Sequence, residues 1–339
     1  MITRAGVEKL GAVHAVEPAV LSLYLSVPPH PAEPRRLIAR ANELIAAAEG
    51  NAGRWHLSED DQSSAMEMVA TAGRNWPGRT VAIFTCADAG LNEAIPVRCG
   101  LPERAVLGTR PHIRPLLVVL QQCPAYHVVV ADGGHAWMCS LTGDEIESVT
   151  ACHHYRDAAA MLKRDMRHGE HEPLVVGGRD GDVRDLLAGL QPIMREDYAG
   201  SFDADSGMLT PARVRDLAAP VIARWSEQRT QHLAGEILAT PPGGLAAVGL
   251  PACLAAVNSC AAETLVVPAD GLVPGYECGR CGALSTAADS CPDWGTAPLQ
   301  VPDVIEEMVS RTLEDGGQVT VIRDASSPVV ARLHFPVTP

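Results

Sequence analysis

Three cysteines near the C-terminus have a spacing that is typical of metal-binding proteins. Cys278 and Cys281 form a Cys-x-x-Cys knuckle, and Cys291-Pro-Asp-Trp294 begins a second knuckle. One knuckle directs two thiolates at a metal ion, and a paired knuckle completes a tetrahedral zinc site. Trp294 stands where the fourth cysteine would be, so zinc would be held by Cys278, Cys281 and Cys291 with water, Asp293 or a distant histidine. The alternative is a decayed zinc ribbon that is held together by packing.

A basic segment in the middle of the chain carries residue types that contact nucleic acid. Residues 153–171 hold four Arg or Lys and four His but only three acids. Helical spacing brings Arg156, Lys163 and Arg167 within reach of one face, and arginine binds phosphate in a fork. The pattern predicts an RNA-binding segment formed by His153, His154, Arg156, Lys163, Arg164 and Arg167. A solvated amphipathic helix would give the same pattern.

A second basic stretch runs from Arg104 through Arg110 and His112 to Arg114, and no acidic residue follows Arg104 until Asp132. One interpretation is a further RNA-facing stripe. The other is that these arginines cap helices or pair with acids that are distant in the sequence.

Helices and strands alternate along the whole chain, which predicts α/β layers. The 339 residues suffice for two or three domains. We expect three α/β domains, with boundaries at residues 1–122, 123–240 and 241–339, and we take Pro241-Pro242-Gly243-Gly244 as the linker before the last one. Ser58 and Thr210 are expected to cap helices, the second with Pro211 in its first turn.

Composition narrows the class of protein. The formal net charge is −14, and no run of residues approaches the ~18 apolar residues of a membrane span. An acidic surface repels bulk nucleic acid, so RNA contact would need a local patch. No signal peptide is apparent, so we expect a cytoplasmic protein without a membrane partner. Six further cysteines lie in apolar contexts and are expected to be buried free thiols: Cys86, Cys123, Cys139, Cys152, Cys253 and Cys260.

The last hundred residues resemble a known family. The resemblance is carried by Gly244–Cys260, Glu263–Val267, Pro274–Leu284 and Cys291-Pro292. These segments look like the C-terminal domain of the class-1 peptide release factor and Pelota superfamily. The chain is more closely similar to the bacterial archaeo-eukaryotic release-factor-like proteins. A hairpin over Val128–Leu141, the Leu174–Gly178 strand and turn, and the helix after Thr210 resemble the family's middle domain.

This resemblance implies the architecture of two domains. The middle domain would have an RNase H-like fold. The C-terminal domain would be an α/β/α sandwich, like that of release factors and ribosomal proteins, with a degenerate zinc-ribbon insertion.

True release factors of this family insert a Gly-Gly-Gln loop of the middle domain into the peptidyl-transferase centre. The only match here, Gly316-Gly317-Gln318, lies in the C-terminal domain, between a predicted helix and a predicted strand. We interpret it as a glycine cap followed by the start of a strand. The middle domain has Cys152-His153-His154-Tyr155-Arg156 where the loop is expected.

The resemblance therefore implies a ribosome-associated factor that binds the A site without hydrolysing peptide. Pelota-type rescue factors and Balon-type hibernation factors are the relevant relatives. The expected partners are ribosomal RNA, the tRNA acceptor end and a translational GTPase, and the expected state is a monomer. Two alternatives stay open: an atypical peptidyl-tRNA hydrolase that uses His153 or His154 for proton transfer, and a protein-interaction module on the same fold without a ribosomal role.

Overall fold

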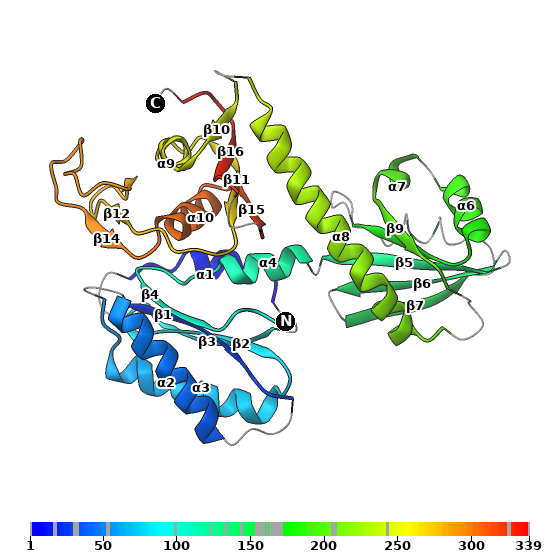
Figure 1. The fold of residues 1–339 in the computed structure, drawn as a ribbon, viewed down its shortest axis with the longest axis horizontal. Helices are drawn as coiled ribbons and strands as arrows, with labels where there is room; N and C mark the ends of the chain where they lie inside the picture. The colour runs from blue at the N-terminus through cyan, green and yellow to red at the C-terminus, as the bar shows by residue number, and fades with distance from the viewer. Residues whose placement is uncertain are drawn as a thin grey trace. The chain divides into compact units, whose positions relative to one another are not determined.

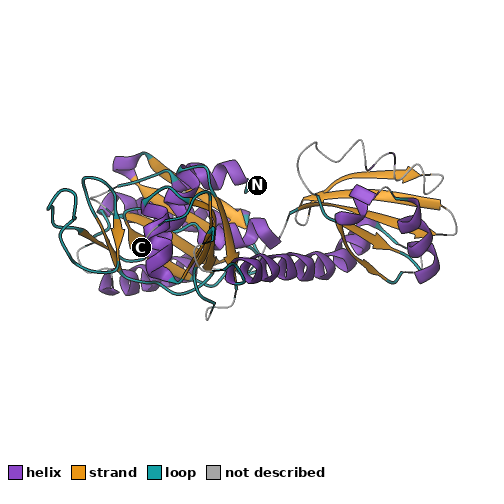
Figure 2. Cartoon of the chain, turned by 90° about the horizontal axis from the view of Figure 1, so that it is seen from above, coloured by secondary structure: helices purple, strands orange, loops and turns teal. Residues whose placement is uncertain are grey.

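The computed structural model divides the chain into two compact units, Met1–Leu120 together with His232–Pro339, and Gln121–Gln231. Helices and strands occur throughout both (Figure 2). The structure describes residues 2–15, 19–29, 34–51, 55–97, 100–122, 124–132, 135–142, 145–152, 160, 162, 172–190, 192–204, 209–241, 244–323 and 327–337.

The first unit begins with a four-stranded antiparallel sheet of order β3-β2-β1-β4 (Figure 1). Its strands are β1 (Val20–Ser26), β2 (Thr80–Cys86), β3 (Leu91–Val97) and β4 (Arg104–Gly108). Helices α2 (Pro34–Asn51) and α3 (Glu59–Asn75) pack on one face of this sheet. Both faces of β1 are covered, which explains its nearly continuous apolar sequence. Ser58 caps α3 as predicted, because its Oγ accepts a hydrogen bond from the Asp61 N–H.

The C-terminal part of this unit is an α/β/α sandwich, as the resemblance implies. Its sheet has the order β10-β16-β11-β15, formed by β10 (Ala246–Val248), β16 (Val330–Leu333), β11 (Ala262–Pro268) and β15 (Gln318–Ile322). Leu265 and Val267 of β11 face helices α9 (Leu250–Asn258) and α10 (Val304–Glu314), whereas Val266 faces Ile237. Ile237 belongs to the last turns of α8 (Pro211–Leu238).

The apolar sequence Leu245–Val257 would suit a helix, but the structure has a short strand before the helix begins. Residues 246–248 form β10, which pairs antiparallel with β16. Gly249 then adopts φ +85°, a conformation that favours glycine, and α9 begins only at Leu250. The chain therefore changes from strand to helix at this glycine.

A small antiparallel sheet of order β13-β12-β14 carries the cysteine knuckles. Its strands are β12 (Gly275–Glu277), β13 (Leu284–Ser285) and β14 (Leu299–Val301). Cys278 directly follows β12, and the segment of Cys291 precedes β14. The sheet therefore fixes the base of both knuckles.

The N-terminal sheet and the C-terminal sandwich share one hydrophobic core. Tyr24 and Phe84 from the first sheet, Leu116 from α4 (Arg114–Gln122), and Ile305 and Met308 from α10 belong to the same buried cluster. Val7 and Leu10 of α1 (Arg4–Gly11) join it. This shared core explains why the two ends of the chain form one compact unit, although the sequence predicts separate domains at residues 1–122 and 241–339.

The second unit contains a five-stranded sheet of order β7-β6-β5-β8-β9. Its strands are β5 (Ala125–Asp132), β6 (His135–Thr142), β7 (Glu145–Cys152), β8 (Leu174–Gly177) and β9 (Tyr198–Phe202). The first three strands are antiparallel, and β8 and β9 run parallel to β5. This order and these directions are those of the expected RNase H-like sheet.

The two faces of this sheet are covered by different helices. Val129 and Met138 face α6 (Asp180–Gly189), and Val128 and Cys139 face the first turns of α8. A short helix α7 (Pro192–Glu196) precedes β9. No helix in the described part of the chain is long and apolar enough to cross a membrane.

Of the six cysteines expected to be buried, Cys86, Cys139 and Cys253 are buried, but Cys260 is exposed, which corrects the prediction. Cys260 lies in the turn after α9, where its φ is +52° and its side chain is exposed. Cys123 and the side chain of Cys152 lie outside the described residues.

Candidate functional site

The six residues predicted to bind RNA all lie outside the described residues. Their place in the topology is nevertheless defined, because β7 ends at Cys152 and Glu172 lies two residues before the start of β8. The basic segment is therefore the connection between the edge strand β7 and the parallel strand β8 of the five-stranded sheet.

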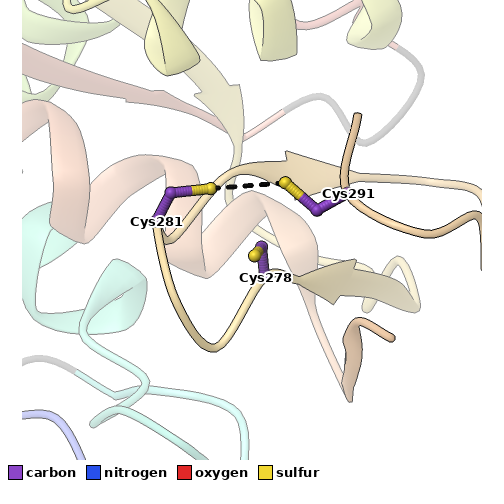
Figure 3. A group of neighbouring side chains, drawn as sticks. All are labelled: Cys278, Cys281 and Cys291. Carbon is purple, nitrogen blue, oxygen red and sulfur yellow. Dashed lines mark hydrogen bonds between the residues drawn. The ribbon is translucent and has the colours of Figure 1, made fainter. Parts of the chain in front are cut away.

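The three predicted metal ligands are brought together by the structure. The Sγ atoms of Cys278, Cys281 and Cys291 all lie within 4.8 Å of one another (Figure 3). The Sγ atoms of Cys281 and Cys291 are 3.6 Å apart. Cys278 and Cys291 are buried and Cys281 is half-buried. Sequence spacing alone therefore located a convergent set of three thiols.

The two knuckles have the same backbone hydrogen bonds. In the first, the Gly282 N–H donates to the Cys278 carbonyl at 2.7 Å, and the Cys278 N–H donates to the Ala283 carbonyl at 2.9 Å. In the second, the Gly295 N–H donates to the Cys291 carbonyl at 2.7 Å, and the Cys291 N–H donates to the Thr296 carbonyl at 3.0 Å.

The glycine that closes each knuckle is left-handed, with φ +70° at Gly282 and +62° at Gly295. Trp294 consequently occupies the position that Cys281 has in the first knuckle. The Arg280 guanidinium lies 3.6 Å from the centroid of the Trp294 ring, which is a close cation–π contact.

The surroundings of Cys278 favour its thiolate. Thr296 Oγ1 lies 3.2 Å from the Cys278 Sγ, and the hydrogen bonds from Thr296 and from the backbone of Cys281 and Arg280 lower the pKa of Cys278 to about 6. Among the described residues, no fourth His, Cys, Asp or Glu joins the three sulfur atoms. Asp293 lies outside this group, which consists of three cysteine sulfur atoms.

The basic stretch from Arg104 to Arg114 is not an RNA-facing stripe, which corrects one of the two interpretations. Arg104 pairs with Asp270, and Arg110 pairs with both Glu307 and Glu314. Arg114 is fully buried. These arginines pair with acids of the C-terminal part, which lie more than 150 residues away in the sequence.

Arg114 is the centre of a buried polar network. Its guanidinium pairs with Asp303 and, at 3.0 Å, with Glu306, and it also donates to the carbonyl oxygens of Pro268 and Gly271 at 2.9 and 2.8 Å. Burial opposes ionisation of Glu306, but His112 and Arg114 outweigh burial and lower the pKa of Glu306 to about 2. At Asp303 burial prevails and raises the pKa.

His112, Asp303 and Glu306 are close enough together to be considered as metal ligands, because their ligand atoms lie within 4.8 Å of one another. Their hydrogen bonds argue against this role. The oxygen atoms of both carboxylates already accept bonds from Arg114 and from backbone N–H groups. A permanently charged guanidinium at the same oxygen atoms repels a cation. The cluster is therefore a structural ion network.

Glu307 is a second buried carboxylate, on the neighbouring position of α10. Thr109 donates to its Oε1 at 2.5 Å, and the Arg110 Nε lies 3.0 Å from its Oε2. Burial and the nearby Glu277 carboxylate outweigh these partners and raise the pKa of Glu307 to about 7.

Replacing Glu307 by glutamine is expected to flatten the pH dependence of stability. The native chain binds this proton up to about pH 7, whereas the unfolded chain releases it at the ordinary pKa of 4.5. Unfolding therefore releases a proton between these values, and stability falls as pH rises through the window, by roughly 3 kcal/mol. Urea unfolding of wild type and Glu307→Gln at pH 5 and pH 8 measures this. An equal fall in both proteins would contradict it.

Gly316-Gly317-Gln318 is a helix cap and a strand start, as the sequence indicates. Gly316, the second residue after α10, has φ +82°, and its N–H donates to the Leu313 carbonyl at 3.1 Å. The Gly317 N–H donates to the Thr312 carbonyl at 2.8 Å, and the exposed Gln318 is the first residue of β15.

Two substitutions test this structural role. A Cβ at Gly317 would lie 2.7 Å from the Ala262 carbonyl oxygen, so Gly317→Ala is expected to cost about 1–3 kcal/mol of stability. Gln318→Ala, at an exposed position, is expected to change stability by less than about 0.5 kcal/mol. Thermal unfolding compares the two variants. A loss of stability in Gln318→Ala as large as that in Gly317→Ala would contradict the assignment.

One polar constellation in the second unit was missed from the sequence. Ser140 Oγ lies 3.0 Å from Nδ1 of His127, and Glu172 Oε2 lies 2.7 Å from its Nε2. His127 and Glu172 are buried, and Ser140 is half-buried. Ser140 pairs with His127 across β5 and β6, and Glu172 precedes β8. Ser140 and Glu172 lie 13 and 45 positions after His127 in the sequence, so only the strand pairing brings the three residues together.

Some solved structures are similar to this chain at low sequence identity. No family model matches the chain, and no curated protein matches it. Among solved structures, Pelota of Archaeoglobus fulgidus is 15% identical over 78% of this chain and 82% of its own, with a TM-score of 0.39. Dom34 of S. cerevisiae, a translation termination-like factor, is 10% identical over 76% and 80%, with a TM-score of 0.42. Ribosome-bound archaeal Pelota is 14% identical over 99% and 95%, also with a TM-score of 0.42.

Proposed function

We propose that this protein is a translation factor that binds the ribosomal A site without hydrolysing peptide, in hibernation or rescue. The absence of peptide hydrolysis is proposed from the position of Gly316-Gly317-Gln318. Gly316 and Gly317 cap α10, and the Cβ position of Gly317 is filled by the Ala262 carbonyl. The motif is therefore built into the C-terminal sandwich, where it cannot act as a mobile loop.

Binding to the ribosome is proposed from the residues that connect β7 and β8. The resemblance places the family's functional loop in this connection, and here it is rich in Arg, Lys and His. The arginines of the other basic stretch, between Arg104 and Arg114, form ion pairs with carboxylates within the first unit. In a chain of net charge −14, the connection is thus the strongest local candidate for contact with ribosomal RNA or the tRNA acceptor end.

A peptide-release assay tests the absence of hydrolysis. Ribosomes carrying peptidyl-tRNA in the P site are incubated with the purified protein, and released peptide is compared with buffer alone and with a hydrolytic release factor. We expect no release above buffer at protein concentrations that saturate binding. Release above buffer would contradict a purely blocking factor.

A translational GTPase is the proposed protein partner. Dom34 is described as interacting with Hbs1, and archaeal Pelota is described on the ribosome with ABCE1. By analogy, we propose that a GTPase delivers this chain to the ribosome, and that the chain is a cytoplasmic monomer. A shift of its elution volume in the presence of a translational GTPase and GTP would support this proposal.

Zinc is the proposed ligand of the cysteine knuckles. Three thiols converge, and both knuckles keep the same backbone geometry, so Cys278, Cys281 and Cys291 would hold the ion. Zinc in such a ribbon supplies stability, by joining the two knuckles at the base of the small sheet.

A second candidate function is ester hydrolysis, the chemistry of a peptidyl-tRNA hydrolase. It is favoured by the Ser140, His127 and Glu172 constellation, in which a hydroxyl, an imidazole and a carboxylate are in hydrogen-bond reach in the order that activates a nucleophile. In this reaction His127 would take the proton of Ser140 as its Oγ attacks the ester carbonyl, and would return that proton to the leaving alcohol. Water would then hydrolyse the acyl-serine.

A fluorophosphonate probe, which labels activated serines, separates the two functions. Labelling at Ser140 that is lost in His127→Gln would support hydrolysis. Ser148, the exposed partner of Ser140 across β6 and β7, supplies the matched control variant Ser148→Ala. No labelling of wild type would leave the blocking factor as the single proposal.

A further inference from the structure

We infer that the cysteine ribbon is a three-thiolate metal centre whose fourth coordination position is open to a small exogenous donor, because Trp294 has replaced the fourth protein ligand. This inference deepens the zinc centre proposed above. It concerns the ligand that completes the coordination shell of the metal ion. It predicts an exchangeable donor at the fourth position, such as water, imidazole or a small thiol.

The repeated knuckle geometry identifies the missing ligand position. In each knuckle the first cysteine and the closing glycine are joined by hydrogen bonds of the same pattern, and in each the glycine has a left-handed φ. The residue before that glycine is Cys281 in the first knuckle and Trp294 in the second. The equivalent backbone position therefore exists, but an indole N–H is only a donor and cannot ligate a metal.

The described residues offer no substitute for this ligand. Only Cys278, Cys281 and Cys291 contribute ligand atoms to the cluster. Thr296 Oγ1 lies 3.2 Å from the Cys278 Sγ, where it acts as a hydrogen-bond partner of the sulfur. A tetrahedral zinc ion held by three protein ligands completes its shell with a molecule from solvent.

The place of the fourth ligand is at the surface and carries a positive charge. Trp294 is 48% exposed, and Arg280 lies over its ring at 3.6 Å from the centroid. Arg280 is also the residue between Gly279 and Cys281 in the first knuckle. Zinc with three thiolates has a net charge of −1, so the adjacent guanidinium compensates for it and favours a neutral or anionic donor at the open position.

Cobalt substitution of the full chain tests this inference directly. Co²⁺ is added to the reduced, metal-free protein under a non-thiol reductant, and the visible d–d and thiolate charge-transfer bands are recorded with and without imidazole. We expect one cobalt per chain, thiolate charge-transfer bands, and d–d bands that shift when imidazole is added. No binding at one equivalent, or d–d bands that do not respond to imidazole, would overturn the inference.

Trp294→Cys is the matched variant, because it restores the fourth thiolate in a knuckle that already has the required backbone. Its d–d bands are expected to shift toward those of a four-thiolate site and to lose the response to imidazole. Trp294→Ala removes the indole without adding a ligand and is expected to behave like wild type, so the inference stays testable if the cysteine variant does not fold. Bands of Trp294→Cys that equal those of wild type would overturn the equivalence of the two knuckles.

The readout is independent of the proposed ribosomal role. Cobalt spectra report the metal shell of the isolated protein, whereas ribosome binding is measured by co-sedimentation. A metal site that is closed to imidazole would overturn this inference alone. An absent metal site would overturn the zinc proposal as well, and a lack of ribosome binding would overturn the proposed ribosomal role alone.

Discussion

Replacing Arg114 by methionine is expected to lower the free energy of unfolding by about 3–5 kcal/mol. The side chain is fully buried, and it contacts Asp303, Glu306 and the carbonyl oxygens of Pro268 and Gly271. Methionine has a similar length but no charge, so both carboxylates would remain buried without their cation. Asp303 and Glu306 belong to the C-terminal part of the first unit, and Arg114 belongs to its N-terminal part. The loss of stability therefore arises at the contact between these two parts.

Urea unfolding checks this effect, with Arg104→Met as its control. Arg104 pairs with Asp270, whose side chain is half-exposed, and loss of such a pair is expected to cost about 1 kcal/mol or less. A triple variant with Arg114→Met, Asp303→Asn and Glu306→Gln is expected to recover part of the loss, because it leaves no uncompensated charge. Equal destabilisation by the Arg114 and Arg104 variants would contradict the central position of Arg114 in the network.

Replacing Arg156, Lys163, Arg164 and Arg167 by alanine is expected to weaken ribosome binding strongly and to reduce its salt dependence. We assume that each of the four cations contacts one phosphate. Raising the salt concentration from 50 to 200 mM then lowers the binding constant of wild type roughly 100-fold more than it lowers that of the variant. Co-sedimentation at the two salt concentrations measures both quantities.

The control for this variant removes the same charge elsewhere. Arg35, Arg36, Arg213 and Arg224 are exposed, and replacing them by alanine changes the net charge equally. This control is expected to retain most of the ribosome affinity. Similar losses in the two quadruple variants would show that total charge decides binding, and would remove the basic segment from the proposal.

The sequence predicted the features that depend on local pattern. Ser58 and Thr210 begin helices as expected, since a cap needs only a side-chain oxygen and the next turn of backbone. The hairpin of β5 and β6 and the glycine cap at Gly316 are equally local. The cysteine spacing located the three thiols for the same reason, because the knuckle is a turn of a few residues.

The partners of buried charges could not be predicted from the sequence. Arg114 lies 189 residues from Asp303, and nothing near Arg114 distinguishes a buried arginine from one that faces RNA. The absence of acids nearby in the sequence, which suggested an RNA stripe, is equally compatible with pairing to distant acids. The His127 and Glu172 contact was missed for the same reason, because strand order in the sheet creates it.

The shared core of the two chain ends also required the fold. Tyr24 and Phe84 occupy the same face of the first sheet, and their alternation predicts a buried face but does not identify what covers it. The same buried cluster holds residues of α1, α4 and α10, and those of α10 lie more than 200 positions later in the sequence. Domain boundaries drawn from linkers and composition therefore separate parts that pack as one unit.

Co-sedimentation of the purified protein with 70S ribosomes, with the A site empty or filled by tRNA, tests the central claim most directly. The proposal predicts binding that weakens as salt is raised and that a filled A site abolishes. Binding that is unchanged when the A site is filled would contradict A-site occupancy. No binding in either state would contradict a ribosomal role for this chain.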